Sequence, residues 1–416
     1  MTALSAVDVS QGIVAIVVHV APELESHLHN LVRTLAPDTS IATPLELCAH
    51  LLEHCAAHSG PAALAVLGAM CRQFGIPATN VHVVVQQHGL DEPAARRVLR
   101  AYYLLWDVEG ARHCYRSSDA PALPALFASD ATRLTAMFGG QPGSSAYLDE
   151  ARWLLDVYRP LLGDYVTRMS AFLGSLTQDS RLAQVYTKGL DAHGWISQSG
   201  PEPGADYLVA APVSMPLAGL VQLMQVMVLY KTLGVSPGEL VRRFDGKCLA
   251  AGHSQGIAVA AALAMLSDEA SFELVSTKAL GILLLVGALP QILHPKYFFG
   301  SSAQPLKPTE TAPRPMLYVR GATKPALEAL LAEFNERQPT DSRHAHLAVT
   351  NSHDQFVVAA TVMSAVKLAE FIAARAAQPD EDQSKVPFSR RKPVITASFV
   401  DITVPYHSPL LEQAVD

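Results

Sequence analysis

Residues 240–265 read LVRRFDGKCLAAGHSQGIAVAAALAM, and this stretch decides the fold. It predicts a short apolar strand, a tight turn at 252–254 and a helix rich in alanine. A strand, turn and helix around G-x-S-x-G form a nucleophile elbow, which lifts a serine hydroxyl clear of the sheet. The helix that follows points its first amides at the charge that develops during acyl transfer. Ser254 is therefore a candidate nucleophile; the alternative is a glycine-tightened βα turn around an inert serine.

A serine nucleophile needs a base, and the sixteen histidines of the chain leave several candidates. His253 precedes the serine, but on such a turn its side chain is expected to point away from the hydroxyl. His407, in VPYHSPL, is the better candidate, because Pro405 and Pro409 stiffen its surroundings. A base must be held within hydrogen-bond reach of its proton. The alternative is that His407 is a surface histidine after a strand.

The sequence FGGQ at 138–141 supplies a candidate oxyanion hole. Glycines after an apolar strand let backbone amides approach a ligand closely. We expect the amide of Gln141 to form one half of the hole and the amide of Gln255, after the nucleophile, to form the other. Taken alone, two glycines after a strand are more often just a turn.

The composition favours a folded protein with a large core and no affinity for nucleic acid. Half of the 416 residues are apolar, 17% are charged and the formal net charge is −7. No basic run offers a surface to a polyanion. The cysteines lack C-x-x-C spacing, which indicates buried thiols in a reduced compartment; they are Cys48, Cys55, Cys71, Cys114 and Cys248. No metal is expected.

Nothing in the sequence predicts a membrane segment. The apolar run at 13–20 lacks the flanks of a signal peptide and is typical of a strand. The most apolar helical stretch, 279–293, is too short to span a bilayer. We therefore expect a soluble, cytoplasmic protein with no membrane partner.

Residues 1–120 are predicted to form a mainly helical scaffold or cap. The run at 10–20 is typical of a buried strand, and the run at 80–90 is ambiguous between a strand and a helix. A linker rich in Ser, Pro and Asp follows at 117–130. Helical patterns occupy residues 23–35, 44–57, 61–74 and 92–106.

Two further regions are predicted after the linker. Residues 131–313 form an α/β core with a parallel sheet, with helical patterns at 147–174, 180–192 and 218–233. Residues 314–404 have the order β-α-β-β-α-β of a ferredoxin-like subdomain. Residues 405–416 return to the core and carry the histidine.

Several segments together resemble one protein family. FGGQ, GHSQG and PYHS occur in this order, with VYTKGL, LGVSPGEL, STKAL and VPFSRRK between them. They resemble the malonyl/acetyl-type acyltransferase fold, and most closely the acetyltransferase at the N-terminus of the fungal type I fatty acid synthase β subunit. The resemblance covers residues from about 127 to 416; residues 1–120 match only loosely. Starter-unit acyltransferase domains of fungal polyketide synthases share much of this layout.

The resemblance implies an activity and a set of roles. Ser254 carries the acyl group, His407 acts as general base and then general acid, and the amides of Gln141 and Gln255 hold the oxyanion. Acetyl moves from coenzyme A to the serine and then to the phosphopantetheine thiol of an acyl carrier protein. No tightly bound cofactor is implied, and other fatty acid synthase domains are implied partners. The family's histidine is oriented largely by backbone carbonyls.

One absence bears on the acyl group. Malonyl-selecting relatives carry an arginine one helix beyond the nucleophile, which clamps the free carboxylate. The corresponding stretch in this chain, FELVSTKALGIL, has Lys278 as its only cation. We therefore expect an uncharged short acyl group, with Lys278 at the acyl pocket. The alternative is that Lys278 is a solvated helix residue.

The chain departs from the family pattern in three places. Pro142 follows Gln141 where the family has glycine, and VVAAT stands at 357–361 where a glycine-rich segment is usual. The family's domain also continues past its histidine motif, whereas this sequence stops at Asp416. These departures suggest a divergent member that is either a fragment of a longer polypeptide or a truncated product.

Four functions are compatible with these features to different degrees. The leading one is an acyl-CoA:acyl-carrier-protein acyltransferase that loads the starter unit in fatty acid synthesis. A polyketide-type loader of a longer acyl chain uses the same chemistry. An inactive structural piece of a megasynthase belongs to a different class. A serine hydrolase fits worst, because that fold places an acid between serine and histidine and has no ferredoxin-like insert.

Overall fold

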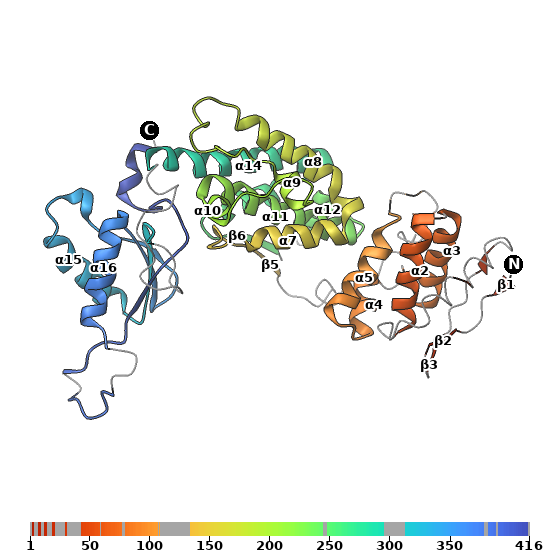
Figure 1. Cartoon of the computed structure of the whole chain (residues 1–416), viewed down its shortest axis with the longest axis horizontal. Coiled ribbons are helices and arrows are strands. Elements are labelled where there is room, and N and C mark those ends of the chain that lie inside the picture. The colour runs from red at the N-terminus through yellow and green to blue at the C-terminus, as the bar shows by residue number, and fades with distance from the viewer. Residues whose placement is uncertain are drawn as a thin grey trace.

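The computed structural model shows three lobes in a row (Figure 1): N-terminal helices, a large middle lobe and a C-terminal lobe built on a small sheet. The described residues are 2–3, 7–9, 12–14, 19–20, 30, 43–58, 60–76, 80–106, 108, 134–243, 248–294, 313–377, 382–387 and 390–414.

The helices of the N-terminal lobe follow the predicted pattern. The ambiguous run at 80–90 contains a helix, whose first turn is capped by the Asn80 side chain accepting from the His82 amide at 2.9 Å. The cysteines Cys48, Cys55 and Cys71 are buried, as predicted. The helices are α2 (Pro44–His58), α3 (Gly60–Gln73), α4 (Val81–Gln87) and α5 (Glu92–Tyr103).

Short strands precede these helices. The single strand expected over 10–20 is instead two strands in separate sheets: β3 (Gly12–Val14) pairs with β2 (Val7–Val9), and β4 (His19–Val20) pairs with β1 (Thr2–Ala3). The predicted linker at 117–130, and the helix at 23–35 apart from Asn30, lie outside the described residues.

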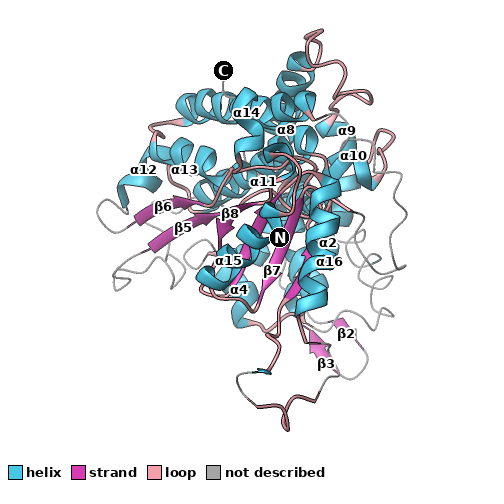
Figure 2. Ribbon diagram, turned by 90° about the vertical axis from the view of Figure 1, so that its left-hand side faces the viewer, coloured by secondary structure: helices cyan, strands magenta, loops and turns pink. Residues whose placement is uncertain are grey.

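The middle lobe carries the parallel pair that the elbow requires. β5 (Leu134–Phe138) and β6 (Cys248–Gly252) lie side by side (Figure 2), with Phe138 opposite Gly252. Helices make up the rest of the lobe. They are α7 (Ala146–Val157), α8 (Arg159–Leu176), α9 (Ala192–Ile196), α10 (Ala205–Val209), α11 (Ala211–Thr232), α12 (Pro237–Arg243), α13 (Gly256–Ala264) and α14 (Glu269–Leu293).

Two apolar helices are longer than predicted. α11 starts seven residues before the expected 218. α14 starts at Glu269 because Asp268 and Ser271 form a capping box there. The expectation that the stretch ending at residue 293 is too short to cross a bilayer is therefore wrong. By length and composition alone, α11 and α14 are both long and apolar enough to cross a membrane. In the folded chain, 83% of the most apolar stretch of α11 is buried inside the protein, against 44% of that of α14.

The helix predicted at 180–192 is absent, because this stretch forms a series of turns. Leu182, Val185 and Gly189 each donate a backbone hydrogen bond to the residue three positions earlier. Gly189 has a positive φ of 67°, which ends any helical run. Leu182 and Val185 are buried, so the apolar spacing that suggested a helix serves the core through turns.

The C-terminal lobe has its own sheet and core. Its strands are ordered β10-β7-β9-β8 and are all antiparallel. Helix α15 joins β7 to β8, and helix α16 joins β9 to β10. Together with the parallel pair, this confirms the predicted α/β fold with a ferredoxin-like subdomain. The elements are β7 (Met316–Arg320), α15 (Lys324–Glu336), β8 (His346–Thr350), β9 (Gln355–Ala359), α16 (Val362–Arg375) and β10 (Thr396–Phe399).

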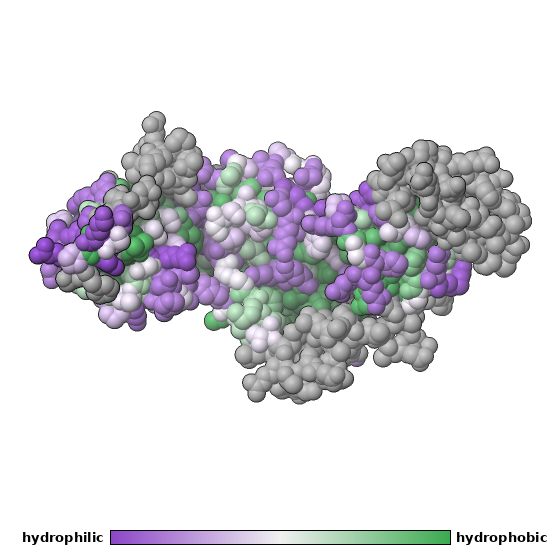
Figure 3. Space-filling view, turned by 90° about the horizontal axis from the view of Figure 1, so that it is seen from below, coloured by the Kyte–Doolittle hydropathy of each residue, from purple (hydrophilic) through white to green (hydrophobic). Residues whose placement is uncertain are grey.

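The described surface is mixed in polarity. On the face shown in Figure 3, polar residues are spread over all three lobes, with apolar residues between them. Helix α14 exposes several large apolar side chains, most of them three or four residues apart and so on one face of the helix. They are Leu274, Ile282, Leu285, Val286, Leu289 and Leu293.

Candidate active site

Ser254 lies on a sharp turn between β6 and α13. Its φ is 51°, a left-handed conformation that costs free energy in a residue other than glycine. A Cβ atom on Gly252 would lie 2.2 Å from the amide nitrogen of Ile257, and one on Gly256 would lie 2.3 Å from the carbonyl oxygen of Phe138. Only glycine fits at either position, so the pattern G-x-S-x-G in this chain forms a strained elbow.

His407 meets the serine from the other end of the sequence. Its Nε2 lies 3.2 Å from Oγ of Ser254, within hydrogen-bond reach. The two residues are 153 positions apart. His407 has a φ of 57°, so it also stands on a left-handed turn. The structure therefore brings together the nucleophile and the base that the sequence proposed.

The segment that carries His407 is anchored to the core by Thr403. This side chain is fully buried; its hydroxyl donates to Oε1 of Gln291 at 2.5 Å and accepts from the amide of Ala211 at 3.2 Å. These contacts join the segment to the end of α14 and the start of α11. The position of His407 is thus set by the two longest helices of the middle lobe.

Further anchors flank the histidine. The hydroxyl of Tyr406 donates to the carbonyl of Val286 at 3.0 Å, and the hydroxyl of Ser408 donates to the carbonyl of Pro405 at 2.6 Å. Both residues adjacent to His407 are therefore held by hydrogen bonds, which limits the movement of the imidazole relative to Ser254.

The imidazole of His407 is suited to act as a base. Partial desolvation, and after it the charge of nearby His253, lower its pKa below the ordinary value. A lowered pKa keeps the ring neutral at physiological pH, and a neutral ring accepts the serine proton. Among the described residues, Nδ1 of His407 has no hydrogen-bond partner, so the backbone carbonyl that the resemblance implies is not found there.

The two expected oxyanion donors flank the elbow. Gln141 follows β5, and Gln255 caps α13 directly after the serine. Neither backbone amide donates a hydrogen bond within the described part of the chain, so both are available to a ligand. The turn after β5 is docked on the elbow, because the amide of His253 donates to the carbonyl of Phe138 at 2.9 Å.

Lys278 lies exposed on α14. Within the described residues it forms no ion pair or hydrogen bond, and none links it to Ser254 or His407. Its role in acyl selection stays a prediction.

Sequence reasoning missed two side chains of α11 that contact the loop at 139–141. Gln222 donates from Nε2 to the carbonyl of Gly139 at 3.0 Å, and Ser214 accepts from Nε2 of Gln141 at 3.0 Å. In the sequence, their only signal was that both are polar residues within the apolar run SMPLAGLVQL.

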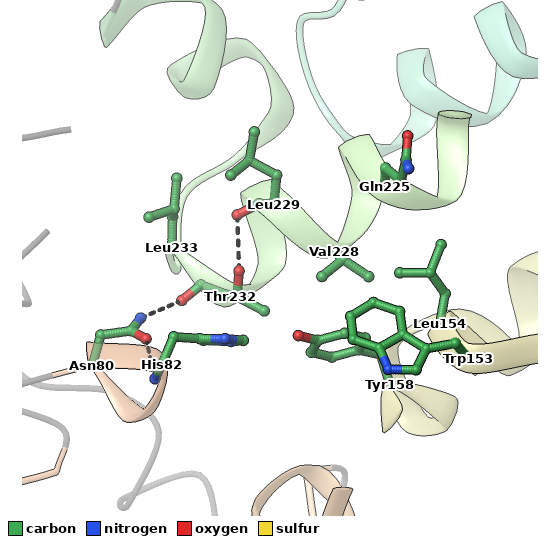
Figure 4. Close-up of a pocket in the computed structure, with 10 residues that line it drawn as sticks. All are labelled: Asn80, His82, Trp153, Leu154, Tyr158, Gln225, Val228, Leu229, Thr232 and Leu233. Atoms are coloured by element: carbon green, nitrogen blue, oxygen red, sulfur yellow. Dashed lines mark hydrogen bonds between the residues drawn. The ribbon is translucent and has the colours of Figure 1, made fainter. Parts of the chain in front are cut away.

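A hollow of about 300 Å³ lies apart from this site, where α4 approaches α7 and α11 (Figure 4). Its lining is mainly apolar, and the hydroxyl of Tyr158 points toward the ring of His82. Burial lowers the pKa of His82 to about 4, so this imidazole is neutral.

The chain matches one family model over residues 136–393, which is more than half of its length. That model is described as the starter unit:ACP transacylase in aflatoxin biosynthesis. The chain belongs to this family. The family is one of acyltransferases, so the chain is an acyltransferase by family.

Curated relatives of this chain include fungal fatty acid synthase subunits, which confirms the predicted resemblance. It is 37% identical over 339 residues to the fatty acid synthase subunit beta of Schizosaccharomyces pombe, covering 81% of this chain and 16% of that one. It is 34% identical over 340 residues to the fatty acid synthase beta subunit aflB of Emericella nidulans, covering 80% and 15%. The chain thus spans about a sixth of the length of these relatives.

Solved acyltransferases show low similarity to the transacylase. A loading acyltransferase from the avermectin modular polyketide synthase matches with a TM-score of 0.40 and 19% identity, covering 68% of this chain and 65% of that one. Malonyl CoA-acyl carrier protein transacylase from Burkholderia pseudomallei matches with a TM-score of 0.38 and 14% identity, covering 68% and 69%.

Proposed function

We propose that this chain transfers an acetyl or other short, uncharged starter group from coenzyme A to an acyl carrier protein, through an ester on Ser254. The observation that carries the proposal is the 3.2 Å contact between Oγ of Ser254 and Nε2 of His407 on a strained elbow. A serine hydroxyl beside a neutral imidazole, with free amides nearby, is the arrangement that acyl transfer needs.

In the first half-reaction, His407 takes the proton of Ser254 as Oγ attacks the thioester carbonyl. The oxygen of that carbonyl becomes negative, and the amides of Gln141 and Gln255 stabilise it. The tetrahedral intermediate collapses and expels the thiolate of coenzyme A, which receives the proton from His407. The acyl group is then held as an ester on Ser254.

In the second half-reaction, His407 takes the proton of the phosphopantetheine thiol. The thiolate attacks the ester carbonyl, and the same two amides stabilise the second tetrahedral intermediate. Ser254 leaves and recovers its proton from the imidazolium. Coenzyme A and the carrier thiol use one base in turn, which is ping-pong transfer.

The choice of an uncharged acyl group rests on α14. A malonyl carboxylate calls for a bidentate cation, and α14 contains no arginine. Lys278 is the one lysine in this helix, and its side chain is exposed. We propose that no cofactor is bound tightly, that both thiol carriers enter as substrates and that transfer occurs in the cytoplasm.

The matched family favours a second candidate. Its description names starter-unit transfer in aflatoxin biosynthesis, so a loader of longer acyl chains for a polyketide or specialised fatty acid synthase is the alternative. Both candidates use the same serine and base. They differ only in the length of the acyl group.

Labelled acetyl-, hexanoyl- and malonyl-CoA separate these candidates. Each is incubated with the protein, the ester on Ser254 is trapped in acid, and an acyl carrier protein bearing phosphopantetheine is added to a parallel sample before trapping. Acetyl labelling that passes to the carrier supports the first proposal, and preferred hexanoyl labelling supports the second. Preferred malonyl labelling contradicts both. An ester that forms but does not pass to the carrier contradicts the transferase role.

A further inference from the structure

We propose that Gln222 of α11 is a positioning residue for the oxyanion hole: its side chain holds the loop at 139–141 so that the amide of Gln141 faces the reacting carbonyl. This inference rests on the proposed function and adds a residue to the same site. Gln222 lies 32 positions before Ser254 and has no hydrogen bond to Ser254 or His407 in the described chain.

The loop needs a tether, because its backbone is intrinsically free. Gly139 and Gly140 follow β5, and consecutive glycines allow more backbone conformations than other residues. A Cβ atom at position 140 would lie 2.8 Å from Nδ1 of His253, so a larger residue there would displace this exposed side chain beside the nucleophile. With glycine at both 139 and 140, restraint of the loop has to come from outside it.

Hydrogen bonds from three directions supply that restraint. The carbonyl of Phe138 accepts from the elbow amide of His253 at 2.9 Å. The next carbonyl, of Gly139, accepts from Nε2 of Gln222 at 3.0 Å. The side chain of Gln141 donates to Oγ of Ser214 at 3.0 Å. Each hydrogen bond fixes a separate point of the loop.

The contact from Gln222 restrains the backbone directly before the peptide that carries the amide of Gln141. The carbonyl of Gly139 and the amide of Gly140 belong to one planar peptide, so a bond to that carbonyl fixes the plane. The following peptide carries the amide of Gln141. Fixing the first plane leaves only the torsions of Gly140 to orient the second, and the space beside Gly140 is limited by His253.

Gln222 is half-buried, and its buried side-chain carbonyl indicates a role beyond packing. Its Oε1 is buried and has no hydrogen-bond partner among the described residues. An unpaired buried carbonyl costs free energy that an apolar side chain would avoid. The same holds for Oε1 of Gln141, the other end of the restraint. Amides at these positions are explained by the donors that they supply to the loop and to Ser214.

The test compares Gln222→Met with Gln225→Met, a matched change three residues further along α11. Gln225 is exposed and its amide contacts Glu150 rather than the loop. Loss of a direct oxyanion donor slows an enzyme by about 10²–10³. For Gln222→Met we expect a smaller loss in the acylation rate of Ser254, about tenfold, with KM for acyl-CoA and the pH midpoint of acylation unchanged.

Two further variants keep the test decisive. Gln222→Glu places an acceptor against the carbonyl of Gly139 and should slow acylation more than Gln222→Met. Ser214→Ala removes the second contact and should also lower kcat without raising KM. Unfolding temperatures report whether any variant is simply unstable.

The outcomes separate this inference from the proposed function. If the wild-type chain forms no ester on Ser254, the proposed function fails. If it does, and Gln222→Met acylates as fast as Gln225→Met, the positioning role is wrong. A loss seen only in KM, or with a shifted pH midpoint, also overturns it.

Discussion

Ser254 and His407 share an uncommon backbone geometry, with φ of 51° and 57°, and their side chains meet at 3.2 Å. Among the described residues other than glycine, only Gln198 also has a positive φ. The two left-handed turns lie where two distant segments of the chain meet. Backbone strain is therefore concentrated at Ser254 and His407, as is common at active sites.

Replacing His407 by Ala should slow the acylation of Ser254 by about 10²-fold or more, since general base catalysis contributes this much. Single-turnover labelling with acyl-CoA measures the rate. His344→Ala, in the C-terminal lobe, is the control and should acylate normally. An unchanged rate in the His407 variant would rule out its role as the base.

The acylation rate should rise with pH and then level off, because only the neutral form of His407 accepts the proton. Desolvation and His253 lower the pKa of His407, so the midpoint of the rise is expected below 6.5. Since His253 contributes to this shift, His253→Gln should move the midpoint upward. His344→Gln should leave it in place. A midpoint above 6.5 in the wild-type chain contradicts this account.

Gly256→Ala should destabilise the protein by about 1–3 kcal/mol or more, the usual cost of overpacking. The added Cβ atom would lie 2.3 Å from the carbonyl oxygen of Phe138, and backbone on both sides leaves little room to shift. Urea unfolding measures the free energy. Gly60→Ala, whose Cβ atom would meet nothing within 4 Å, is the control. Equal stabilities of the two variants would show that the elbow is looser than these contacts require.

Thr403→Val should cost about 1–3 kcal/mol, because Oε1 of Gln291 and the amide of Ala211 lose a buried partner. The loop carrying His407 should loosen, so acylation should slow as well. Unfolding and single-turnover rates check the two effects. Thr350→Val, exposed at the end of β8, should change neither. Loss of stability with full activity would mean that Thr403 does not position the histidine.

Local patterns predicted much of this fold. The elbow was recognisable because strand, glycine turn and helix are encoded within residues 240–265. The ferredoxin-like order followed from the alternation of strands and helices after residue 314. The prediction of a helix at 180–192 was wrong because buried residues spaced three or four apart occur in turns as well as in helices.

Long-range contacts were harder to predict. His407 could be proposed as the base, but its contact with Ser254 depends on Thr403 reaching both α11 and α14. No motif in the sequence pointed to Gln222, because its proposed role depends on which loop lies beside α11. Such relationships arise only from packing, and a single sequence does not contain them locally.

The most direct test of the central claim is to locate the acyl group on the protein. The chain is incubated with acetyl-CoA, quenched in acid, digested and analysed by mass spectrometry, with Ser254→Ala alongside. We predict acetylation of the peptide containing GHSQG, located on Ser254 and absent from the variant. Acetyl on another residue, or equal labelling of the Ser254→Ala protein, would contradict the account.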